Sequence, residues 1–161
     1  MISWSDQPAI AANLFNPAFF GEMIRRLSDA YVSESGREMP FVFAFLAPPL
    51  ALYPDSNRTL KARSYDYLHT WVTANPGIRI TLARRCRELA PHVRLGMMFA
   101  IAHEAIEISQ TGGIRPLKRP KGYHKPAIDS SQYFVRCRTL GRWLARVDQV
   151  SNVFLMLGLG L

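Results

Sequence analysis

His103 and Glu104 open a stretch that resembles a metal-binding helix. In zinc proteases the pattern His-Glu-x-x-His puts two imidazole ligands on one helix face, with the glutamate as general base. Here the second ligand position holds Glu107, and no other histidine-rich segment completes a tetrahedral site. The sequence therefore predicts a polar edge on a core helix and no bound metal.

Other signatures of catalysis are missing from the sequence. It has no phosphate-binding P-loop motif, no glycine-rich dinucleotide fingerprint and no Gly-x-Ser-x-Gly elbow. The 12 acidic residues are spread along the whole chain, so paired carboxylates are scarce. Cys86 and Cys137 form no Cys-x-x-Cys pair and are expected to be reduced thiols. We predict no catalytic residue, no cofactor and no enzyme activity.

Basic side chains offer a different chemistry, the binding of acidic partners. The net charge is +8 and the pI is near 10, which favours nucleic acid, an anionic membrane surface or an acidic protein face. Arg138, Arg142 and Arg146 stand four residues apart and so stack as one ridge on a helix. The ridge lies opposite that helix's apolar stripe. We interpret it as a docking ridge for an acidic protein surface or for phosphates; a merely solvated face is the alternative.

A second basic patch lies in the Pro- and Lys-rich stretch, which we expect to be an exposed loop over residues 115–128. Beside a wing-like hairpin, such a loop would contact DNA phosphates or an acidic partner. The alternative is a solubilising loop. The candidate contact residues are Lys118, Arg119, Lys121 and Lys125.

Helical periodicity dominates the rest of the chain and predicts a mainly α fold: a single compact helical domain over residues 1–161. Its parts include an N-terminal extension at 1–15 and an apolar tail at 153–161 that needs a surface to pack on. Asn16 and Pro17 are expected to cap and open the first helix, and Gly36 to stop it. Further helices are predicted at 59–74, 78–89, 91–109, about 129–148, and after a cap at Ser151 or Asn152.

Three features refine the prediction of this fold. A small wing-like β-hairpin fits residues 106–117, around a Gly-Gly turn. Residues 41–52 read as a short buried helix that ends or kinks near Ala47 because Pro48 and Pro49 break it, with a core strand as the alternative. Residues 95–102 are apolar nearly all round, which predicts the central core helix. Trp71 and Trp143 lie on apolar stripes and are expected in the core.

The start of the chain has neither a basic nor an apolar leader region, and no apolar run is long enough for a membrane span. We expect a soluble, cytoplasmic protein.

Several segments together resemble a known family. They are Asn16-Pro-Ala-Phe19, Leu46-Ala-Pro-Pro-Leu50, Trp71 with Asn75-Pro76, and Leu140-Gly141-Arg-Trp143 before a short apolar helix that ends near Leu157-Gly158. Their order and spacing resemble the middle components of bacterial three-component ABC systems, which include the small subunit of Lamassu-type anti-phage defence.

The resemblance implies a role in a protein complex and no catalytic reaction. Such a subunit would bridge an SMC-like ABC ATPase, which senses DNA, and an effector such as a nuclease, holding the effector inactive until the ATPase engages invading DNA. Any DNA contact would then be indirect, and no membrane is involved. The motif positions would be structural: Asn16, Pro17, Trp71, Pro76, Leu140, Gly141 and Trp143.

The alternative from another class is a winged-helix DNA-binding regulator. Such a protein reads DNA with a polar recognition helix just before the wing. Here the helix predicted at 91–109 is the most apolar in the chain, which disfavours DNA reading.

Overall fold

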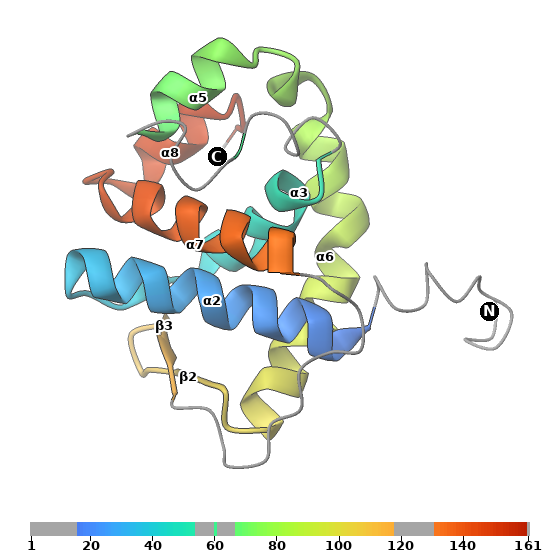
Figure 1. The fold of residues 1–161 in the computed structure, drawn as a ribbon, viewed down its shortest axis with the longest axis vertical. Helices are drawn as coiled ribbons and strands as arrows, with labels where there is room; N and C mark the ends of the chain where they lie inside the picture. Colours follow the sequence, from blue (N-terminus) through green and yellow to red (C-terminus); the bar gives the residue numbers. More distant parts are fainter. Residues whose placement is uncertain (1–15, 54–59, 61–66, 118–130, 161) are drawn as a thin grey trace, which may run out of the picture.

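A computed structural model describes residues 16–53, 60, 67–117 and 131–160. These residues form a mainly α-helical fold with a small sheet at one end (Figure 1). Helix α2 (Pro17–Ser35) crosses the middle, with α7 (Ser131–Ala145) alongside it and α6 (Ile78–Ala102) crossing its N-terminal part (Figure 1). The predicted extension at 1–15 lies outside the described residues.

Helix α2 begins and ends as the sequence predicts. Asn16 Oδ1 accepts a hydrogen bond of 2.8 Å from the backbone N–H of Ala18, and Pro17 occupies the first turn. Gly36 ends the helix with φ of 68°, and its N–H donates to the Val32 carbonyl at 2.8 Å. A positive φ suits glycine because it has no Cβ to clash.

Glycines allow α2 to touch both of its neighbours backbone to backbone. A Cβ built on Gly96 of α6 would lie 2.5 Å from Phe20 Cβ and 2.9 Å from the backbone nitrogen of Gly21. A Cβ built on Gly141 of α7 would overlap the carbonyl oxygen of Leu27. Both crossings therefore require glycine, and they bring the apolar faces of three helices into one core.

Helix α6 corrects the prediction of two helices at 78–89 and 91–109. It runs unbroken from Ile78 to Ala102 with Pro91 inside it. A proline removes one helical hydrogen bond and crowds the preceding turn, but the buried Val93, Gly96 and Met97 just after it pack on the core and hold the helix together. The helix ends at Ala102 because the chain then turns into a strand.

The apolar segment at 41–52 also differs from its prediction. It forms a 3-10 helix, η2 (Phe41–Phe45), and then a separate helix, α3 (Ala47–Ala51). Pro48 and Pro49 stand in the first turn of α3, where their missing N–H groups have no helical partner to lose. The prolines thus begin a helix instead of breaking one.

The predicted hairpin is confirmed and belongs to a three-stranded antiparallel sheet. Strand β2 (Ile106–Ile108) pairs with β3 (Gly113–Pro116), and β3 also pairs with β1 (Met39–Pro40), giving the order β1-β3-β2. The Glu38 carboxylate, just before β1, accepts hydrogen bonds from the hydroxyls of Ser109 and Thr111 and pairs with Arg115. Glu38 therefore fastens the hairpin to β1.

Helix α5 (Leu68–Ala74) covers only the end of the helix predicted at 59–74; residues 61–66 lie outside the described part.

The C-terminal part packs on the same core. Helix α8 (Val150–Met156) has Gln149 as its cap, not Ser151 or Asn152. Val153 and Leu157 of the apolar tail are fully buried, so the tail finds its surface within this chain. Among the described helices, none is both long and apolar enough to cross a membrane.

Gly96→Ala should lower the free energy of unfolding by about 1–3 kcal/mol, because the added methyl meets the backbone of α2. The effect should appear even though alanine favours helices over glycine by about 1 kcal/mol. Urea unfolding measures it. Gly160→Ala is the control, since a Cβ there meets nothing within 4 Å. If both variants unfold like the wild type, the helix crossing is looser than described.

Candidate partner-binding surface

Arg138 and Arg142 of the predicted ridge lie on the outer side of α7, and Arg146 directly follows the last residue of that helix, Ala145. Arg138 and Arg146 are exposed and Arg142 is half-buried. The opposite side of the helix carries the buried stripe of Cys137, Leu140, Trp143 and Leu144. The stripe, Arg138 and Arg142 thus stand where helical spacing predicts them, whereas the helix ends just before Arg146.

The arginines of this ridge are not equivalent. Arg146 Nε lies 2.9 Å from Glu34 Oε1 of α2, and its guanidinium stands 5.7 Å from the ring centroid of Tyr67. Arg142 Nη2 reaches the Thr139 hydroxyl at 3.4 Å. The sequence shows no acid interleaved along this face of α7, but α2 supplies one at the C-terminal end of the ridge. The charge offered to a partner therefore centres on Arg138 and Arg142.

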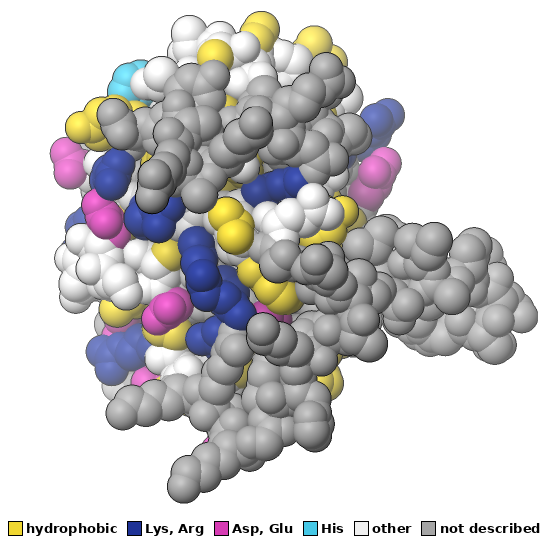
Figure 2. All heavy atoms as spheres, viewed as in Figure 1, with side chains coloured by type: hydrophobic (Ala, Val, Ile, Leu, Met, Phe, Trp, Pro, Cys, Tyr) yellow, Lys and Arg dark blue, Asp and Glu magenta, His cyan; other side chains and the backbone are white. Residues whose placement is uncertain are grey.

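Figure 2 shows the face of the molecule that α2 and α7 share. Lys and Arg side chains gather over these two helices, with Asp and Glu side chains between them (Figure 2). This mixed pattern fits a surface for protein contact, where charges of both signs set orientation.

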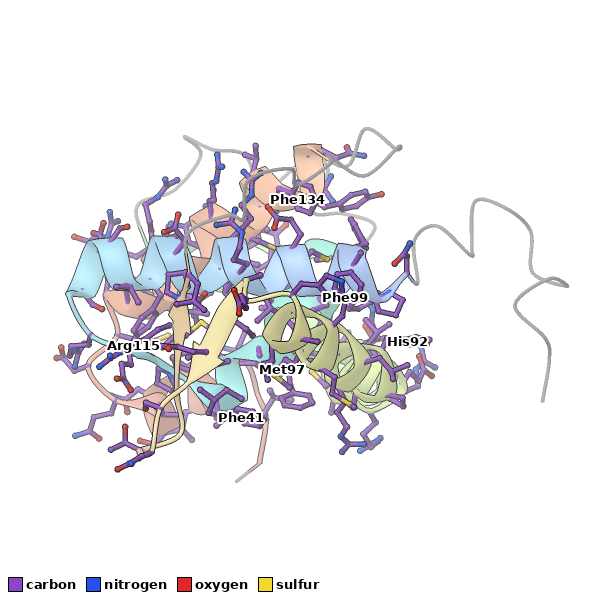
Figure 3. All side chains as sticks on the ribbon, turned by 90° about the horizontal axis from the view of Figure 1, so that it is seen from below. Phe41, His92, Met97, Phe99, Arg115 and Phe134 are labelled. Atoms are coloured by element: carbon purple, nitrogen blue, oxygen red, sulfur yellow. The ribbon has the colours of Figure 1, made fainter. Side chains whose placement is uncertain are left out.

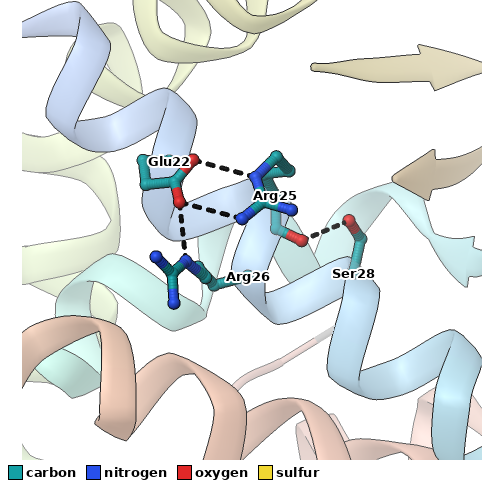
Figure 4. A network of polar contacts seen from close by, with 4 residues as sticks. All are labelled: Glu22, Arg25, Arg26 and Ser28. Atoms are coloured by element: carbon teal, nitrogen blue, oxygen red, sulfur yellow. Dashed lines mark hydrogen bonds and ion pairs between the residues drawn. The ribbon is translucent and has the colours of Figure 1, made fainter. Parts of the chain in front are cut away.

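Beneath that surface, Glu22 holds two arginines on α2. Arg25 Nε and Nη2 each donate to its carboxylate at 2.9 Å, and Arg26 Nε donates at 2.6 Å (Figure 4). Glu22 and Arg25 are buried, and Arg26 stands 5.1 Å from the ring centroid of Phe134 on α7. Arg26 follows Glu22 by four residues and Arg25 follows it by three, the two spacings that bring side chains together on a helix. These charges satisfy one another inside the fold.

Arg136 is a buried cation that the sequence analysis did not single out. Its Nη1 donates to the carbonyl of Ala51 at 2.7 Å, and its guanidinium stands 4.9 Å from the ring centroid of Tyr133. Burial lowers the pKa of Arg136 from its ordinary value. Ala51 is the last residue of α3, so Arg136 ties α7 to the carbonyl end of that helix. The available signal was its position four residues before Leu140, which puts it on the apolar stripe.

The segment from His103 to Glu107 does not form a helix edge, contrary to the prediction. His103 is the C-cap of α6, with Nδ1 2.9 Å from the Phe99 carbonyl and its ring stacked on Phe99. Glu104 has φ of 54°, and Glu107 lies on β2. The turn separates the carboxylates, so the three side chains share no helix face. Within the described ranges, no three His, Cys, Asp or Glu residues are grouped to hold a metal.

The residues of the family resemblance lie at junctions of the core. Trp71 and Trp143 are buried with ring centroids 5.8 Å apart. Asn75 Nδ2 donates to the Trp71 carbonyl at 2.9 Å, and Pro76 follows in the turn before α6. Leu140 is buried beside Gly141 at the crossing with α2. The four basic residues of the 115–128 loop, Lys118, Arg119, Lys121 and Lys125, lie outside the described residues.

Both cysteines lie in surroundings that disfavour the thiolate. Burial raises the pKa of the half-buried Cys86 thiol from 9.0 to about 11. Burial raises the pKa of Cys137 too, and its side chain is fully enclosed. Because the thiolate is the nucleophile, neither sulfur is activated for catalysis.

At pH 8, the rise in pKa leaves Cys86 with about a hundredfold less thiolate than a free thiol, but the more basic thiolate is the better nucleophile. Cys86 should therefore react with a disulfide reagent about tenfold more slowly than a free thiol does. Cys137 should stay unreactive until urea unfolds the chain. A colour-forming disulfide reagent measures both rates, and Cys86→Ser should remove the slow phase while leaving the second thiol protected. Rapid reaction of either thiol in the folded protein would contradict the environments described.

No curated protein and no solved structure matches the chain. A family model described as ABC-three component (ABC-3C) system Middle Component 3 matches residues 4–160. The matched range takes in Asn16, Trp71, Gly141 and Trp143, the helix cap and junction residues described above, and it covers nearly the whole sequence. The chain therefore belongs to the family of Middle Component 3 proteins of ABC-three component systems.

Proposed function

We propose that this chain is a non-catalytic adaptor that links an SMC-like ABC ATPase to an effector such as a nuclease, in a Lamassu-type system that defends bacteria against phages or plasmids. In this proposal the chain restrains the effector until the ATPase engages invading DNA. The observation that carries the proposal is family membership over residues 4–160, because a middle component works beside other components.

The polar contacts of the described part support a structural role. Glu22 neutralises arginines of its own helix, and Glu38 fastens the hairpin to β1. Arg136 holds the end of α3. The carboxylates of Glu22 and Glu38, which could otherwise serve acid–base chemistry, are thus occupied in holding the fold together, as is the Arg136 guanidinium.

The ridge on α7 is the surface that we assign to an acidic partner face. Arg138 and Arg142 lie on one side of a helix whose other side is fixed in the core. A rigid base lets a charged ridge present a defined pattern, which favours orientation and fast association. Contact with DNA would then pass through the ATPase.

The winged-helix regulator is the weaker alternative. The hairpin β2–β3 does follow α6 directly, as a wing follows a recognition helix. However, the exposed side of α6 next to the hairpin carries Leu95, Met98 and Ile101, and reading base edges requires hydrogen-bonding side chains.

The double change Arg138→Glu with Arg142→Glu should abolish co-purification with the acidic partner, since it places like charges across the contact. The fold should persist because both side chains point outward. Arg146→Gln is the matched control: it removes the pair with Glu34, which as a partly exposed pair contributes about 0–1 kcal/mol, and should leave the complex intact.

If the ridge binds DNA phosphates instead, the double variant keeps its protein partners but loses DNA affinity, and the salt dependence of binding falls by about one unit per lost contact. A double variant that keeps both its protein partners and its DNA affinity would show that the ridge is only a solvated surface.

The chain should show no nuclease or ATPase activity alone, and the effector mixed with this subunit should cleave DNA more slowly than the effector by itself. Addition of the ATPase, ATP and linear DNA should restore cleavage. Gel assays of plasmid cleavage measure each state. Equal cleavage with and without the chain would contradict the restraining role. Cleavage by the chain alone, abolished by a point mutation in it, would contradict the adaptor role.

A further inference from the structure

Three large apolar side chains stand exposed on the C-terminal half of α6. Leu95 is 47% exposed, Met98 67% and Ile101 43%. Their spacing of three residues keeps them on one side of the helix. The other side, with Val93, Gly96, Met97 and Ala100, is buried against the core. The sequence predicted that this segment, apolar nearly all round, is the central core helix. The structure places one side of it in the core and leaves the other side exposed, because α2 and η2 cover only part of its circumference.

Figure 3 looks nearly along α6 and shows what surrounds this face. Phe99 lies on the side next to α2, and Met97 on the side next to η2 and Phe41 (Figure 3). The apolar tail does not reach over the face, because Val153 and Leu157 are buried at the other end of the molecule, near α5 (Figure 1). Phe41 of the neighbouring η2 is itself 39% exposed.

The charges along the same helix are almost all positive. Helix α6 carries five arginines and a single acid, Glu88, which lies 3.7 Å from Arg84. Arg87 and Arg94 are exposed on the turns that lead into the apolar face. A partner that covers this face would therefore meet an apolar centre with a basic edge. A second copy of this chain would bring a net charge of +8 against +8, which opposes self-association.

Resting on the proposed function, we propose that the face of α6 formed by Leu95, Met98 and Ile101 docks an amphipathic helix of one of the other two subunits, with an apolar stripe edged by carboxylates. The apolar side chains supply burial, methionine adapts its shape to the stripe, and Arg87 and Arg94 pair with the carboxylates. Such a helix laid against an apolar face is a common mode of recognition.

This face and the arginine ridge lie on different sides of the molecule. In Figure 3, α7 lies on one side of α2 and α6 on the other. Two subunits could therefore bind at once without competing, one on the ridge and one on α6. This arrangement is what a bridging subunit requires.

The test measures binding of this chain to the purified ATPase and to the purified effector by titration calorimetry. Met98→Glu should weaken binding to one of them about 30-fold or more, the loss expected for a central apolar anchor. Leu155→Glu is the matched control: Leu155 is 70% exposed on α8, which lies at the opposite end of the molecule from the C-terminal half of α6 (Figure 1), and its change should leave both affinities unaltered. Circular dichroism should show both variants folded.

The charge contribution is tested separately with Arg94→Glu, which should weaken the same binding about tenfold at low salt and less at high salt. Arg94→Lys, which keeps the charge, should bind nearly as the wild type does. A loss caused by Arg94→Lys as well would overturn the assignment of Arg94 to a charge contact.

The outcomes separate the two proposals. If the wild-type chain binds neither subunit, the proposed function fails and the docking face fails with it. If the complex forms and Met98→Glu leaves it intact, only the docking face is wrong. Light scattering decides the remaining case: a dimer of the isolated chain that Met98→Glu dissolves would assign this face to a second copy and overturn the proposal.

Discussion

The fold depends on the close approach of α2 to two other helices. Gly96 lets α6 come near enough that any side chain there would collide with Phe20 and the Gly21 backbone, and Gly141 does the same for α7 against Leu27. Helices this close exclude water and bring many apolar side chains into contact. Around these crossings lie Phe20, Met23, Ile24 and Leu27, all fully buried. Packing thus explains the motif of Leu140, Gly141 and Trp143: the glycine allows the close approach of α7 to α2, and the two apolar side chains are buried beside it.

Buried charges fix the relative positions of these helices once they are packed. Glu22 with its two arginines and Arg136 with the Ala51 carbonyl are polar groups inside a mainly apolar core. Such groups add little net stability compared with apolar ones, but leaving one without its partner is costly. A shifted register would separate Arg136 from Ala51 and Arg26 from Phe134. The charges therefore disfavour alternative packings.

A core organised in this way leaves the outer side of α7 and that of the C-terminal half of α6 exposed, and these are the two surfaces that we propose for partner binding. The outer side of α7 is basic, and that of α6 is apolar with a basic edge. The chain belongs to a family of middle components of three-component systems, and such membership fits surfaces that contact other components. The two surfaces differ in chemistry, so they suit different partners.

The sequence by itself determined the features that depend on near neighbours. The Asn16 cap, the Gly36 stop, the hairpin and the stripe of α7 follow from local backbone preferences and from spacing. Tertiary structure decided the rest. Pro91 stays inside a helix because distant residues pack on either side of it, and Pro48 and Pro49 begin a helix because η2 ends just before them. The two-residue strand β1 exists because β3 lies beside it. Spacing also placed Leu95, Met98 and Ile101 in an apolar segment, but only the position of α2 and η2 left them exposed. The exposure of a residue depends on which distant segments of the chain pack against it, and the local sequence pattern does not determine that.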